Sequence, residues 1–129
     1  MSYDLSRVVA ELMLEPEELL EVYQSFFRET RQNLVNCHKA LATANHDTLP
    51  GIFHSIKGSA LNLRMTELAE LLLEMENLYN KGNLREVAQR IPDLEQKVRS
   101  IESSVIRYYS ANFFSGYENC PNEYDRSSN

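Results

Sequence analysis

The fold is decided by the stretch DTLPGIFHSIKGSALNL, residues 47–63, which separates into an apolar and a polar side when it is wound as a helix. Successive side chains of a helix lie about 100° apart. This step gathers the expected core face: Leu49, Ile52, Ile56, Ala60 and Leu63, with the small Ser59 among them. His54 lies on the opposite side, toward solvent. Because a helix with one apolar side packs that side against other elements, the stretch predicts one member of a larger helical assembly.

Two glycines flank His54 on the polar side of this helix. Gly51 precedes the histidine by three residues and Gly58 follows it by four, although a glycine inside a helix costs about 1 kcal/mol relative to alanine. Gly58 lies about 40° from His54 and away from the core face, which argues against helix packing within the chain as its purpose. We expect both glycines to let another molecule approach the imidazole.

Further segments repeat apolar residues at helical spacing. They cover residues 4–14, Pro16 to about Thr43, Thr66 to Gly82, and Asn83 to about residue 110. Pro16 suits a first helical position, Thr66 suits a cap, and Pro92 should kink the last helix without ending it. Short links make neighbouring helices antiparallel. The sequence therefore predicts an all-α fold, an up-down antiparallel four-helix bundle with a short extra N-terminal helix, over residues 1–110. We expect the tail, residues 111–129, to be partly packed or mobile.

Composition excludes several functions. A net charge of −6 argues against a nucleic-acid binder, which needs a basic surface to meet phosphates, and against docking on an anionic membrane. No apolar run approaches the roughly 18 residues of a membrane span, and the first residues lack a signal-peptide pattern. Cys37 and Cys120 match no metal-ligand spacing, so we expect reduced thiols in a cytoplasmic protein. Glu-x-x-His pairs and Gly-rich phosphate loops are absent from the sequence, and we expect neither a metal nor a cofactor.

A lone exposed histidine is usually an ordinary surface residue, but the neighbours of His54 suit phosphoryl chemistry. Neutral imidazole is a nucleophile near physiological pH. Lys57, three residues on, places an ammonium group beside the ring, which is useful if the ring carries a phosphoryl group of about −2 charge. His38 and His46 lack a Lys-Gly partner, and we expect a helix-surface residue and a turn residue, respectively.

The run from His54 to Gly58, HSIKG, resembles the phospho-accepting motif His-x-x-Lys-Gly of the histidine phosphotransfer (HPt) domains. It is particularly similar to the P1 domain of chemotaxis-type histidine kinases. The resemblance in helix order and spacing runs over about residues 5–108. It implies that His54 is phosphorylated, that Lys57 binds the phosphoryl oxygens, and that Gly58 leaves room for the partner.

Two further positions bear on this resemblance. Glu76, in the run MENL, resembles a glutamate that orients the histidine in P1 domains. The turn near Arg64 also puts His54 level with residues 74–76 of the antiparallel helix, so Glu76 can accept a hydrogen bond from the ring nitrogen that is not phosphorylated. The alternative is a solvated carboxylate like that of Glu74. Arg64 departs from the family, which usually has a glycine there; if that glycine caps the helix, Arg64 must end it in another way.

These residues predict a histidine phosphotransfer protein of a two-component phosphorelay. It would be a carrier and not an enzyme, exchanging a phosphoryl group between His54 and a receiver-domain aspartate or a histidine kinase, with Mg²⁺ supplied by the receiver. We expect a monomer whose partners dock on Gly51 and Leu61, and on Val9 or Met13 of the first helix. The alternative is a helical-bundle interaction module that has lost phosphotransfer.

Overall fold

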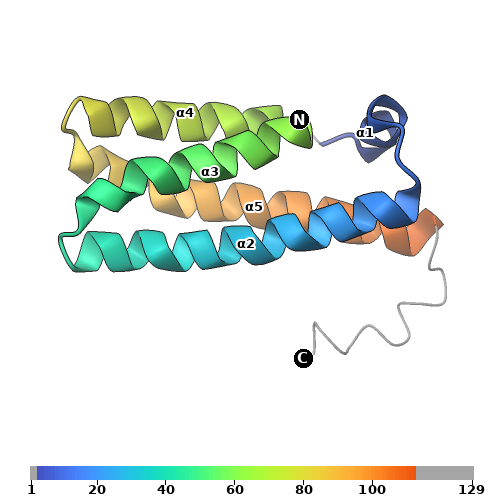
Figure 1. Ribbon diagram of the computed structural model, residues 1–129, viewed down its shortest axis with the longest axis horizontal. Helices are drawn as coiled ribbons and strands as arrows, with labels where there is room; N and C mark the ends of the chain where they lie inside the picture. The colour runs from blue at the N-terminus through green and yellow to red at the C-terminus, as the bar shows by residue number, and fades with distance from the viewer. Residues whose placement is uncertain (1–2, 113–129) are drawn as a thin grey trace.

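Four long helices lie side by side in the structure, a computed structural model that describes residues 3–112 (Figure 1). In chain order the described residues form α1 (Leu5–Leu12), α2 (Pro16–Ala42), the short 3₁₀ helix η1 (His46–Thr48), α3 (Leu49–Asn62), α4 (Thr66–Asn80) and α5 (Leu84–Asn112), and no strand. Helices α2 to α5 alternate in direction, and α1 lies at the end of the bundle where α2 begins. The predicted all-α bundle with an extra N-terminal helix is confirmed.

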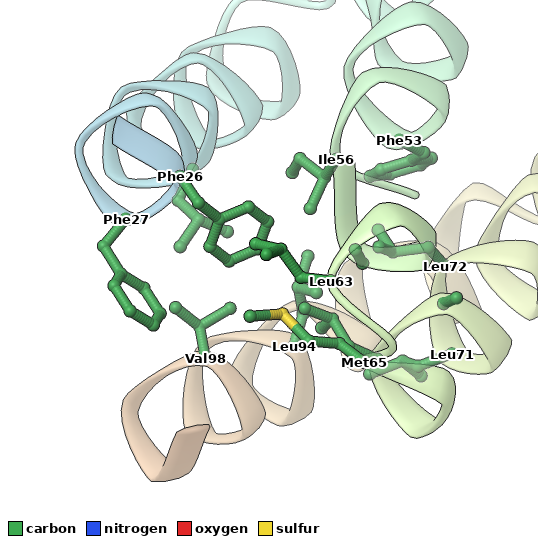
Figure 2. Packing of buried hydrophobic residues seen from close by; sticks show 14 of the residues in the cluster. Phe26, Phe27, Phe53, Ile56, Leu63, Met65, Leu71, Leu72, Leu94 and Val98 are labelled. Carbon is green, nitrogen blue, oxygen red and sulfur yellow. The ribbon is translucent and has the colours of Figure 1, made fainter. Parts of the chain in front are cut away.

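Apolar side chains from all four long helices fill the centre of the bundle (Figure 2). Phe26 of α2 and Leu94 of α5 face Ile56 of α3 and Leu72 of α4 across the same interior. All four are buried. Burial of apolar area contributes about 25 cal/mol per Å² to the stability of the fold. Because turning one helix about its axis would expose its apolar side, the packing of all four fixes the rotation of each.

The core face of α3 is turned slightly from the predicted one. Phe53, which the predicted face omits, is fully buried, whereas Ile52 and Ser59 are only half-buried. An aromatic ring offers more apolar area than an aliphatic chain, so packing with Phe53 inward is favoured. The rotation is small enough to leave His54 on the solvent side.

The start of α2 agrees with the capping signals in the sequence, whereas the start of α4 does not. Helix α2 begins at Pro16, and the carboxylate of Glu18 accepts a hydrogen bond from the Glu15 backbone N–H at 3.0 Å, as in a capping box. The prediction that Thr66 caps α4 is wrong. Met65 is the N-cap residue and Thr66 is the first helical residue, and Met65 makes no side-chain capping bond.

Other boundaries shift by a few residues, as frayed helix ends commonly do. Helix α1 is shorter than residues 4–14, because Met13 adopts a left-handed conformation with φ 57°. The predicted helix over 47–63 is divided into η1 and α3. Helix α5 passes through Pro92 and ends at Asn112, two residues beyond the predicted end of the bundle. Residues 113–129 of the predicted tail lie outside the described residues.

Arg64 ends α3 in the conformation that a glycine would adopt. Its φ is 61°, in the left-handed region. The Met65 N–H donates to the Ala60 carbonyl at 2.8 Å and the Arg64 N–H to the Leu61 carbonyl at 3.1 Å, which is the bond pair of a Schellman motif. The same motif surrounds Gly82, at φ 77°, after α4. The expectation that Arg64 ends the helix in another way is therefore wrong.

The side chain of Arg64 connects α1 to the end of α3. Its Nε donates to Glu11 Oε1 at 3.0 Å, and its Nη1 donates to the Asn62 carbonyl at 3.1 Å. A left-handed conformation costs a non-glycine residue about 1 kcal/mol or more, and an exposed ion pair is worth about 0–1 kcal/mol. The contacts of the side chain thus offset part of the backbone strain.

A pair of tyrosines holds the start of the chain against the same end of the bundle. The Tyr3 hydroxyl donates to the Leu63 carbonyl at 2.5 Å and lies 2.6 Å from the Tyr23 hydroxyl, which donates to it. Burial raises the pKa of Tyr3 to about 12 and also raises the pKa of Tyr23. Both hydroxyls therefore stay protonated, and keep their hydrogen bonds, to a higher pH than an exposed tyrosine would.

We expect Arg64→Gly to be more stable than Arg64→Ala by about 1 kcal/mol, because both variants lose the Glu11 contact but only glycine adopts a positive φ without strain. Urea unfolding of the two variants measures this difference in the free energy of unfolding. Equal stabilities would show that the left-handed conformation at residue 64 costs nothing.

Candidate functional site

Helix α3 presents His54 to solvent because its other side is occupied by the core. Phe53 and Ile56 are buried on either side of it in sequence, and one helical step of about 100° places the imidazole outside. The His54 side chain is 77% exposed. A protein partner can therefore reach this ring without any rearrangement of the bundle.

A carboxylate from α4 meets α3 beside this histidine. Lys57 Nζ lies 2.6 Å from Glu76 Oε1, and His54 Nδ1 lies 3.7 Å from Glu76 Oε2. The first distance is a short charge-assisted hydrogen bond, while the second is longer than a hydrogen bond. Glu76 thus binds the lysine directly and lies beside the ring nitrogen nearest to it. The second ring nitrogen, Nε2, is left as the one available to a partner.

The ion pair is much less accessible than the histidine. The side chains of Lys57 and Glu76 are 20% and 15% exposed. Charges in such a position are only weakly screened by salt, and each would be costly to desolvate without the other. The pair therefore holds a cation and an anion in fixed positions under an exposed imidazole.

The glycines leave open space around His54. A Cβ atom added at Gly51 or at Gly58 would meet no heavy atom within 4 Å, apart from the immediate backbone. Neither glycine is therefore required for packing within the described part of the chain, as the sequence argument expected for Gly58. Both residues are exposed.

Apolar side chains are exposed near the C-terminal end of α3. Leu61 is 53% exposed and Met13, at the end of α1, is 88% exposed, whereas Val9 is half-buried and packs against the core. The Arg64–Glu11 pair at 3.0 Å holds α1 beside the end of α3. Of the predicted docking residues, Val9 offers the least free surface.

Sequence reasoning missed one exposed apolar residue of α4. Leu73 is 48% exposed and lies one helical turn before Glu76, on a neighbouring part of the helix surface. A signal was present, because Leu71, Leu72 and Leu73 are consecutive and a helix that is covered on one side buries only some of three successive residues. Leu71 and Leu72 are the buried ones.

The remaining histidines and the described cysteine lie elsewhere. His38 on α2 is exposed, and its Nε2 lies 2.8 Å from Glu95 Oε2 on α5. His46 is half-buried in η1. Cys37 is fully buried, and burial raises its pKa to about 12, so it is an unreactive packing residue. Cys120 lies outside the described residues.

Within residues 3–112, no three His, Cys, Asp or Glu side chains gather where they could hold a metal ion. In the same part of the chain, every helix is too short or too polar to cross a membrane.

We expect Gly58→Ala to raise the free energy of unfolding by about 0.5–1 kcal/mol, since the added methyl meets open space and alanine favours a helix. The matched control is Gly82→Ala, which has equally open surroundings but a φ of 77°, and which should lower stability. Thermal unfolding of both variants measures these opposite shifts. A loss of stability in Gly58→Ala would mean that residue 58 packs against the chain after all.

The comparisons with known proteins agree with this geometry. The model of the Hpt domain family matches residues 21–104, more than half of the 129-residue chain, and leaves α1 outside the match. No curated protein and no solved structure matches the chain. Hpt domains are phosphoryl carriers of phosphorelays and are typically not enzymes on their own. The predicted family is confirmed, and the chain belongs to the Hpt domain family.

Proposed function

We propose that this protein accepts and donates a phosphoryl group on His54, exchanging it with the aspartate of a response-regulator receiver domain or taking it from a histidine kinase. The observation that carries the proposal is the half-buried Lys57–Glu76 pair beneath an imidazole that is 77% exposed. An ordinary surface histidine needs neither a fixed cation nor a fixed anion within reach of its ring.

Glu76 selects the reacting nitrogen in this proposal. Its Oε2 is 3.7 Å from Nδ1, so its charge favours the tautomer with the proton on Nδ1 and leaves the lone pair on Nε2. The nucleophile therefore points away from the protein. A small movement of the ring toward Glu76 would convert the 3.7 Å contact into a hydrogen bond, as catalytic contacts commonly tighten once a partner binds.

The transfer itself is an in-line displacement. The lone pair of His54 Nε2 attacks the phosphorus of an aspartyl phosphate, an N–P bond forms, the P–O bond to the aspartate breaks, and the aspartate leaves as a carboxylate. The proton on Nδ1 stays on the ring, which becomes positively charged beside the Glu76 carboxylate. The reverse sequence returns the phosphoryl group. The receiver would supply Mg²⁺, so this chain mainly provides position and charge.

Lys57 would neutralise charge on the phosphoryl oxygens. In the structure its ammonium group donates a hydrogen bond to Glu76 at 2.6 Å. Lys57 follows His54 by three residues, so the two side chains lie about one helical turn apart. An incoming phosphoryl group would give the ammonium a second anionic partner on the solvent side. Because Lys57 is already anchored, little side-chain entropy is lost when it binds the transferred group.

Docking would use the surface around the histidine. We propose that a receiver contacts Gly51, Gly58 and Leu61 directly. Met13 would extend this surface at the end of the bundle, and Val9 would contribute by packing α1 against the core. Such a surface would form the small interface that is typical of a transient signalling complex. The open space at both glycines lets a flat partner surface approach Nε2.

The decisive experiment compares the wild type with His54→Gln. Purified protein is mixed with a panel of phosphorylated receivers, and acid-labile phosphate on the bundle is followed over time. We expect uptake by the wild type and by the control variant His38→Gln, whose histidine is also exposed, but none by His54→Gln. Equal uptake by His54→Gln, or no uptake by the wild type from any receiver of the panel, would favour an interaction module without phosphotransfer.

A second variant tests the lysine. A hydrogen bond to a charged group contributes about 1.5–3 kcal/mol, so Lys57→Ala should slow phosphotransfer by about 10- to 150-fold while circular dichroism shows an intact bundle. Lys39→Ala, which removes an exposed lysine from α2, should transfer at the wild-type rate. An unchanged rate in Lys57→Ala would remove this residue from the mechanism.

A further inference from the structure

An apolar groove lies between α2 and α5, on helices that carry none of the residues proposed for phosphotransfer. Its volume is about 430 Å³, and its apolar lining comprises Leu20, Tyr23, Phe27, Val105, Ile106 and Tyr109. Ile106 remains 42% exposed and Leu20 is half-buried. Apolar pockets between the helices of a bundle are common binding sites.

The chain leaves the described region beside this groove. Ser110 lines the groove and α5 ends two residues later, at Asn112. The next five residues, FFSGY at 113–117, include three aromatic side chains and a glycine.

Length and charge both fit an occupant from this part of the chain. The groove extends along α5 from Ser110 back to Glu102, which is about 12 Å of helix, and five extended residues reach about 17 Å. Beyond Tyr117 the sequence is acidic, with three carboxylate residues and one arginine. The groove is bordered by Arg28 and Arg31 of α2 and by Glu102 of α5, which pairs with Arg31 at 2.9 Å. These three side chains sum to one positive charge, which complements the acidic residues.

We propose that residues 113–117 bind in this groove, with the side chains of Phe113, Phe114 and Tyr117 covering Leu20 and Ile106. A segment joined to the groove by a few residues has an effective concentration in the millimolar range, which favours it over a second copy of the chain or a separate protein. Occupancy would stabilise the α2–α5 side of the bundle without covering His54, which projects from α3.

The natural cysteines provide the test. Cys37 is fully buried, so a thiol-reactive spin label on the full chain attaches to Cys120. We expect the label to broaden the NMR amide signals of Leu20, Gln24 and Ile106, and to leave those of Gly51 and Leu61 sharp. Broadening confined to the α3 side, or no broadening in the described helices, would overturn the proposal.

Variants of the segment and of the groove make the test specific. The triple variant Phe113→Ser, Phe114→Ser and Tyr117→Ser should abolish the broadening, whereas Asn119→Ser with Asn122→Ser should retain it. On the groove side, Ile106→Asp should abolish it and Val35→Asp should not, since Val35 is 47% exposed and does not line the groove. Persistence in the triple variant or in Ile106→Asp would contradict the proposal. A mixing experiment distinguishes a second copy: isotope-labelled protein without a spin label is mixed with spin-labelled protein that carries no isotope label. Broadening of the groove signals in this mixture would show instead that a second copy occupies the groove.

Discussion

Burial of one side of α3 is the constraint on which the candidate site depends. Phe53 and Ile56 are held in the interior shared by α2, α4 and α5, and their positions leave α3 no freedom to rotate. His54 must then face solvent, and Lys57 must lie toward α4. The chemistry of the surface is thus set by apolar packing beneath it, because a helix presents its residues at a fixed angular step.

The Lys57–Glu76 pair then acts as a link between packing and chemistry. A partly buried ion pair is weak support for stability, because the cost of desolvating both charges can equal their attraction. Its value here lies in position. Glu76 is carried by the helix that packs beside α3, so the relative placement of α3 and α4 determines where the ammonium group of Lys57 lies under the imidazole.

Much of the fold could be predicted from the sequence, because it depends on local rules. Helical spacing of apolar residues, Pro16 at a helix start and Gly82 at a helix end indicated the element order, and the His-x-x-Lys-Gly motif indicated the family. The failures also have physical causes. Phe53 was missed because the rotation of α3 is decided by its neighbours. Arg64 was expected to end α3 in another way than a glycine does, but its φ is 61°. Its side chain binds Glu11 and the Asn62 carbonyl, and these contacts between α1 and the end of α3 offset part of the backbone strain.

By itself, the sequence determined which segments are helical, that the bundle is all-α, and that His54 lies opposite the apolar side of its helix, because capping and periodicity act within a few residues. Only the tertiary structure decided the contacts between helices. These include the preference of Glu76 for Lys57 over a hydrogen bond to His54, the attachment of α1 through Tyr3 and Glu11, and the apolar groove between α2 and α5. Such contacts depend on the rotation and register of whole helices, which result from the packing of all apolar faces together and not from any single stretch.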